Sequence, residues 1–89
     1  MRFSRPLRIA WTPIALADLK RLGGSLRDRM AGAIRRFAEE GLGDVVPLKG
    51  QPGRYRLRAG NWRILLTHLE EEQTLRVDAI RARGGAYRP

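Results

Sequence analysis

Arginine alternates with apolar residues in a short segment past the middle of the chain. The alternating positions are Arg54, Tyr55, Arg56, Leu57, Arg58 and Ala59. A period of two is that of a β-strand, so the guanidinium groups project from one face of a sheet and the apolar side chains from the other. Neighbouring arginines repel one another, yet their planar forks suit the oxygens of a polyanion. The strand therefore predicts a phosphate-binding surface, with RNA or DNA as the first ligand to consider.

The overall charge points to the same class of partner. The chain has 18 Lys and Arg residues against nine Asp and Glu, a formal net charge of +9 at pH 7. Lys20 and Lys49 are its lysines, so almost all of the positive charge is guanidinium. This balance indicates a nucleic-acid partner, an acidic protein partner or both. A general solubilising charge is the alternative.

The length of 89 residues leaves room for one compact domain, residues 1–89, with a modest core. Without cysteine, neither a disulfide framework nor a thiolate metal site can form, which is consistent with the cytosol. The basic segment Met1–Arg8 is not followed by an apolar leader region, and no stretch is long enough to span a bilayer. We expect a soluble cytoplasmic protein with no membrane association.

The first half of the chain predicts a strand and a helix hairpin. Leu7, Ile9 and Trp11 alternate with other residues as in a strand whose apolar side faces a core. Thr12 followed by proline favours a helix from residue 13 to about 22, which ends at two glycines. Ser25 is then expected to cap a second helix that runs to about residue 40. Its Met30 and Phe37 stripe is interpreted as core.

The second half predicts an antiparallel sheet. A connecting loop is expected at Gly41–Pro47, followed by strands at Arg54–Ala59, Asn61–Leu69 and Thr74 to about Arg81. Their connections are too short for parallel pairing. The predicted fold is α+β, in the order β-α-α-β-β-β, with a mainly antiparallel sheet packed against the N-terminal helix hairpin.

Further arginines are expected on the same face of this sheet. Arg63 can join the arginines of the preceding strand while Trp62 enters the core. In the last strand, Ala79 belongs to the apolar side, so a straight strand would turn Arg81 toward the core. A bulge or a strand end before Arg81 is therefore required. Asp78 is expected to pair with a neighbouring arginine.

Two segments together resemble the RelE branch of the RelE/ParE superfamily of bacterial toxins. They read LKGQPGRYRLRAGNWRILL from residue 48 and DAIRARGGAY from residue 78. The resemblance covers essentially the whole chain, including the helix hairpin. It implies a toxin of a type II toxin–antitoxin pair that enters the ribosome and cuts mRNA without a metal or other cofactor. The implied partners are a cognate antitoxin, the ribosome and mRNA.

The resemblance also implies site residues. The catalytic set falls on Arg56, Arg58, Arg63, Arg81 and Tyr87. Additional RNA contacts are expected from Lys49, Arg54, Arg83 and Arg88. The best-known family member has lysines where this chain has Arg56 and Arg58. Arginine stabilises charge well but is too hard to deprotonate to act as a base, so Tyr87 is the better base candidate.

Two other functions compete with mRNA cleavage. A ParE-like toxin on the same fold would inhibit DNA gyrase by binding, without catalytic residues. A non-enzymatic nucleic-acid-binding module would bind free RNA but leave mRNA on translating ribosomes intact. His68 is the single histidine, which excludes a two-histidine ribonuclease site within one chain, and no acidic cluster has the spacing of a two-metal nuclease.

Overall fold

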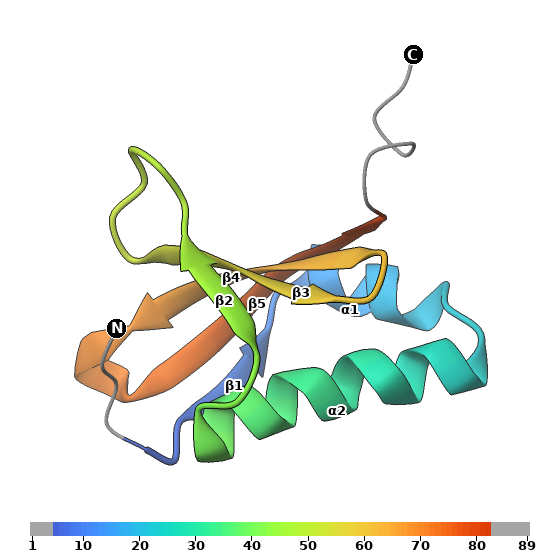
Figure 1. Cartoon of the computed structure of the whole chain (residues 1–89), viewed down its shortest axis with the longest axis horizontal. Helices are drawn as coiled ribbons and strands as arrows, with labels where there is room; N and C mark the ends of the chain where they lie inside the picture. Colours follow the sequence, from blue (N-terminus) through green and yellow to red (C-terminus); the bar gives the residue numbers. More distant parts are fainter. Residues whose placement is uncertain (1–4, 83–89) are drawn as a thin grey trace.

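Two helices cover one face of a five-stranded sheet within residues 5–82, which are the residues that the structure describes (Figure 1). In this computed structural model the elements are β1 (Arg8–Trp11), α1 (Pro13–Lys20), α2 (Gly24–Glu40), β2 (Asp44–Pro47), β3 (Arg54–Ala59), β4 (Trp62–Leu69), a 3₁₀ turn (Glu70–Glu72) and β5 (Thr74–Ala82). The strand order is β1-β5-β4-β3-β2, with β1 parallel to β5 and the other neighbours antiparallel. The predicted α+β class and element order are confirmed.

The hydrophobic core lies between the helix hairpin and the sheet. On α2, Met30 and Phe37 are at most 3% exposed, which confirms that this stripe is core. The sheet contributes side chains that are at most 1% exposed, namely Leu57, Ile64, Leu66, Leu75 and Val77. Trp62 packs against this cluster but is only partly buried. The face of β3, β4 and β5 that these residues leave open is called the outer face below.

The helix boundaries follow the capping residues, with one difference from expectation. The Thr12 Oγ1 accepts a hydrogen bond from the Ala15 amide at 3.0 Å, and proline opens α1 as predicted. The N-cap of α2 is Gly23 rather than Ser25, because the extended backbone of Gly23 already presents its carbonyl to the Arg27 amide at 2.8 Å. Neither of these described helices is long and apolar enough to cross a membrane.

Part of the expected loop at Gly41–Pro47 is a strand. Residues Asp44–Pro47 form β2, which pairs with β3 so that Asp44 stands opposite Arg58. Four residues ending in proline are too few to show a clear alternation, and proline is tolerated at a sheet edge. The extra strand brings a carboxylate beside the arginines of β3.

The first strand is less buried than its sequence suggests. Ile9 is 37% exposed, although Leu7 is 5% exposed and Trp11 packs against the core. The reason is that β1 is a short edge strand, paired on one side with β5. An edge strand has a neighbouring strand on one side only, and Ile9 keeps part of its surface in solvent.

Candidate nucleic-acid interface

The alternating arginines of β3 lie on the outer face of the sheet. Leu57, which stands between two of them, is 1% exposed and belongs to the core under the helices. Neighbouring side chains in a strand point to opposite faces, so Arg54, Arg56 and Arg58 share the outer face. The alternation therefore predicted correctly which side chains of β3 face the core and which face outward.

Three arginines form a row across the outer face. Arg58 on β3 stands directly opposite Arg63 on β4, and Arg63 stands directly opposite Arg81 on β5. Side chains opposed in this way have Cβ atoms about 4.5–5.5 Å apart. Arg58, Arg63 and Arg81 are called the arginine row. Like charges in these positions repel, so an anion that bridges them is strongly favoured.

A β-bulge brings Arg81 into this row. The pairing of β4 with β5 shifts register between Leu65 and Leu66, so that Asp78 is an extra residue in β5. The extra residue reverses the facing of all later side chains in the strand. The predicted bulge before Arg81 is confirmed. Ala79, expected on the core side, instead stands opposite Leu65 on the outer face, because the bulge precedes it.

A buried carboxylate on α1 anchors Arg81. The Asp18 Oδ2 accepts hydrogen bonds from Arg81 Nη1 at 2.7 Å and from the Ile80 amide at 2.9 Å. Its Oδ1 accepts one from Arg21 Nη1 at 3.0 Å, and the residue is 8% exposed. The strand β1 pairs with β5 only as far as Val77, so α1 supplies the acceptor for the next part of this edge. Asp18 thus ties the helix hairpin to one end of the arginine row.

Sequence reasoning missed Asp18. It lies three residues after Ala15 and four before Leu22, which is the spacing of one helix face. Ala15 is buried in the core and Leu22 packs against it. An acidic residue at a buried helical position needs a donor or a cation, and this was the signal that could have located it.

At the opposite end of the row the ion pairs are long and exposed. Asp44 approaches Arg58 Nε at 3.7 Å and Arg56 Nη2 at 3.8 Å, and its side chain is 55% exposed. Pairs of this kind contribute little stability. The Nε atoms of Arg54 and Arg56 are both buried with no hydrogen-bond partner among residues 5–82. A phosphate would therefore bind the outer Nη groups of Arg56, which meet Asp44 only at 3.8 Å.

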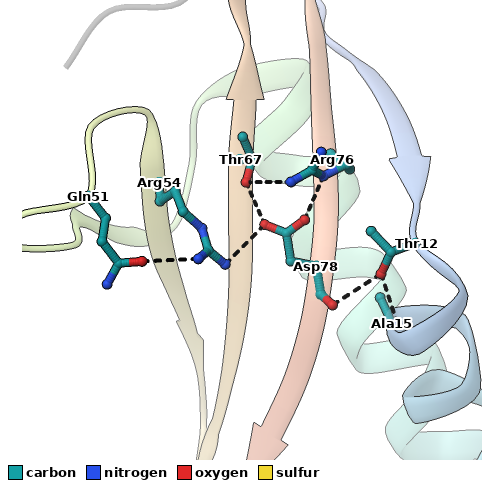
Figure 2. A network of polar contacts seen from close by, with 7 residues as sticks. All are labelled: Thr12, Ala15, Gln51, Arg54, Thr67, Arg76 and Asp78. Carbon is teal, nitrogen blue, oxygen red and sulfur yellow. Dashed lines mark hydrogen bonds and ion pairs between the residues drawn. The ribbon is translucent and has the colours of Figure 1, made fainter.

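A closed polar network occupies the other part of the outer face (Figure 2). Asp78 accepts hydrogen bonds from Arg76 Nε at 2.6 Å, from the Thr67 hydroxyl and from Arg54 Nη2 at 3.4 Å. Arg54 also donates to Gln51 Oε1 at 3.0 Å. These five residues are called the Asp78 network. The expected pairing of Asp78 with a neighbouring arginine is confirmed, and it holds Arg54 in a contact within the fold.

Four further candidate residues were predicted outside the arginine row and the Asp78 network. Lys49 is exposed in the loop between β2 and β3, which rises on the side away from the helices (Figure 1). Arg83, Tyr87 and Arg88 lie outside the described residues, so their roles stay predictions. The structure therefore brings together Arg56, Arg58, Arg63 and Arg81, and leaves Lys49 apart from them.

The chemistry that this surface offers is that of guanidinium groups. They bind phosphate oxygens through paired hydrogen bonds and stabilise negative charge that develops on phosphorus. Within residues 5–82 no group of three or more His, Cys, Asp or Glu side chains is placed to hold a metal ion.

The sequence matches one protein family over most of its length. Residues 9–87 match the family described as ParE toxin of type II toxin–antitoxin system, parDE. No curated protein matches the sequence significantly. The family match confirms the resemblance to the RelE/ParE superfamily.

Solved toxin structures share the fold at low sequence identity. The archaeal RelE–RelB complex from Pyrococcus horikoshii OT3 is 19% identical with a TM-score of 0.75, over 89% of this chain and 97% of that one. The RelBE2 toxin–antitoxin complex from Mycobacterium tuberculosis is 24% identical with a TM-score of 0.76, over 88% and 99%. The YoeB/ParE toxin from Agrobacterium tumefaciens is 22% identical with a TM-score of 0.72, over 88% and 100%.

These likenesses support the fold, and the family match covers both the helix hairpin and the arginine row. The bulged β5 and the arginines of β3 and β4 all lie inside the matched residues 9–87. This chain belongs to the ParE toxin family, within the RelE/ParE superfamily of type II toxin–antitoxin systems.

Proposed function

We propose that this toxin is a ribosome-dependent, metal-independent mRNA endoribonuclease of the cytoplasm, held inactive by a cognate antitoxin. The observation that carries the proposal is the arginine row, in which one residue from each of three strands is aligned across a bulge. Like charges held opposite one another lower the stability of the fold, and a bound anion offsets this cost. The ligand that matches their spacing and charge is a phosphodiester of RNA.

Cleavage without a metal uses the 2′-hydroxyl of the RNA as the nucleophile. A base removes its proton, and the 2′-oxygen attacks phosphorus. The bond from phosphorus to the 5′-oxygen then breaks, an acid protonates that oxygen, and a 2′,3′-cyclic phosphate remains. The crowded phosphorane between these steps carries extra negative charge, which fixed cations stabilise.

The roles follow from what each side chain can do. Arg56 and Arg58 hold the scissile phosphate, and Arg63 at the centre of the row stabilises the phosphorane. Arg81, held by Asp18 at 2.7 Å, stabilises the leaving group from the end of the row. Tyr87 activates or orients the 2′-hydroxyl, since arginine holds its proton too firmly to act as a base.

The test is to map mRNA ends in a translation extract with and without the purified toxin. We expect new ends within the ribosomal A site that carry a 2′,3′-cyclic phosphate. A message with 2′-deoxyribose at the cleaved nucleotide should stay intact, because it lacks the nucleophile. The proposal would be contradicted if the toxin cleaved the message that carries 2′-deoxyribose. It would also be contradicted if ordinary mRNA stayed intact in the extract that contains the toxin.

One observation favours a second function, inhibition of DNA gyrase by binding. The matching family is that of the ParE toxins. A supercoiling assay with purified gyrase separates the two functions, because a binding inhibitor blocks supercoiling and leaves translated mRNA whole. Blocked supercoiling together with intact mRNA would select the gyrase function. RNA binding without either effect would indicate a non-enzymatic module.

A further inference from the structure

A cleft lies between α2 and the end of β3. It is separate from the arginine row, except that Arg58 belongs to both. Its volume is about 350 Å³. Its lining includes Arg29, Arg36 and Arg58, together with Ala33, Leu42 and Leu57. The cleft therefore combines three guanidinium groups with an apolar floor.

Two of these cations have no acidic partner within the described chain. Arg29 and Arg36 are exposed on α2, and neither forms an ion pair with any carboxylate of residues 5–82. The third, Arg58, meets Asp44 only at 3.7 Å, with both side chains at least 50% exposed. The rim of the cleft is therefore strongly positive and open to an anion.

The floor of the cleft suits an apolar side chain. Leu57 and Ala33 are at most 8% exposed and form part of the core, while Leu42 is 55% exposed at the rim. Leu42 adds apolar surface at the rim, and burying that surface under an apolar ligand group would be favourable. An anionic ligand with an apolar anchor would satisfy both the rim and the floor.

The lining favours a peptide over RNA. It contains no aromatic ring, so a nucleobase would find no stacking partner there. Leu57 and Ala33 lie on the helix side of the sheet, whereas Arg63 and Arg81 lie on the outer face. A strand of RNA held by the arginine row would have to pass around the sheet edge to enter the cleft.

We propose that this cleft is the docking site for an acidic segment of the antitoxin, in which an apolar residue lies between carboxylates. The apolar residue fills the hollow over Leu57, and the carboxylates pair with Arg29 and Arg36. Because Arg58 forms both a wall of the cleft and one end of the arginine row, an occupant also neutralises part of that row. The inference rests on the proposed antitoxin partnership and not on mRNA cleavage.

The probe is a short synthetic peptide in which glutamate alternates with leucine, labelled for fluorescence anisotropy with the purified toxin. We expect the double substitution of Arg29→Gln and Arg36→Gln to weaken binding by about tenfold or more, since two charge pairs are lost. The matched control is Arg27→Gln with Arg35→Gln, which removes the same charge from exposed positions of α2 outside the cleft. The control should change binding by less than about threefold.

Two further comparisons separate this site from nonspecific charge. A peptide with serine for leucine should bind about tenfold more weakly, and Leu42→Ser, at an exposed position, should lower the affinity for the leucine peptide only. Equal weakening by the cleft and control doubles would overturn the proposal. So would loss of RNA affinity in the cleft double with unchanged peptide affinity.

The test is independent of catalysis. The cleft double should cleave mRNA at the wild-type rate, because Arg29 and Arg36 lie outside the proposed catalytic set. If the wild-type toxin cleaves no mRNA but the peptide binds as described, the proposed function fails and the docking site stands. If mRNA is cleaved and the peptide shows no preference for the cleft, the docking site fails.

Discussion

The two parts of the outer face present the same kind of side chain in different electrostatic settings. In the Asp78 network, Arg54 and Arg76 share a carboxylate that is 11% exposed, at 3.4 and 2.6 Å. In the arginine row, Arg58 meets an exposed carboxylate at 3.7 Å, and the close partner of Arg81 lies on α1 at the strand edge. The network shares a carboxylate that is almost buried among its arginines, whereas the carboxylate beside Arg58 is exposed and more distant.

The difference shows that two separate properties decide whether an arginine can bind a phosphate. One is the face of the sheet on which its side chain lies, and the other is whether a nearby carboxylate already pairs with it. Strand alternation determines the face on which the side chain lies. The position of nearby carboxylates determines whether its charge is already compensated. Arg54 and Arg56 have the same alternation and differ in this second property, so a ligand phosphate should be held by Arg56 in preference to Arg54.

The largest effect is expected at the centre of the row. Arg63→Ala should lower single-turnover cleavage on saturated ribosomes by about 10²–10³, the usual effect of removing one transition-state donor. The fold should persist, because the substitution removes repulsion from Arg58 and Arg81. Arg54→Gln should lower the rate by less than about tenfold, since Asp78 already neutralises Arg54. Equal losses for the two variants would erase the distinction between the row and the network.

The next effect is on stability. Asp78→Ala should lower the free energy of unfolding by about 2–3 kcal/mol, because Arg54, Arg76 and Thr67 lose a shared acceptor. Urea denaturation measures this change. Asp44→Ala provides the control and should cost less than about 0.5 kcal/mol, because its pairs are long and exposed. A similar cost for both aspartates would show that the Asp78 network is not a structural cluster.

A smaller loss is expected at the edge where α1 meets the row. Asp18→Asn keeps an acceptor for the Ile80 amide but loses the charge that pairs with Arg81, which should cost about 1–2 kcal/mol. The exposed Asp28→Asn on α2 serves as its matched control and should leave the urea midpoint unchanged. An unchanged midpoint for Asp18→Asn would mean that Arg81 is not anchored by charge.

The smallest effect concerns the carboxylate beside Arg56 and Arg58. Asp44→Asn should raise the affinity for a short RNA by about two- to threefold, since a local anion that competes with phosphate is removed. Fluorescence anisotropy at low salt would detect the change. Weaker RNA binding in this variant would show that Asp44 orients the arginines rather than competing for them.

Much of this arrangement could be predicted from the sequence because it depends on periodicity. The alternation of β3, the proline that opens α1 and the required bulge before Arg81 are local signals, and all are confirmed. The bulge was predictable because a straight strand with Ala79 on its apolar side would turn Arg81 toward the core. Parity also predicted that Arg63 lies on the face of the β3 arginines.

The features that could not be predicted depend on contacts between residues that are far apart in the sequence. The strand β2 and the carboxylate of Asp18 have no local pattern strong enough to show them, and each acquires its role from a partner far along the chain. The same is true of the Asp78 network, which joins residues 51 and 54 to 67, 76 and 78. Compensation of charge is a tertiary property, so the alternation of a strand does not show which of its arginines has a carboxylate nearby.

The central place of β5 has a consequence for synthesis of the toxin. Residues 8–11 pair with residues 74–77, and β5 also pairs along β4, so the sheet closes only when this late strand is present. Contacts between segments so far apart in sequence form slowly and late in folding. A nascent chain that has not yet released β5 from the ribosomal exit tunnel has no complete arginine row. The arginine row is therefore complete only after Arg81 has left the tunnel and β5 has paired with β4.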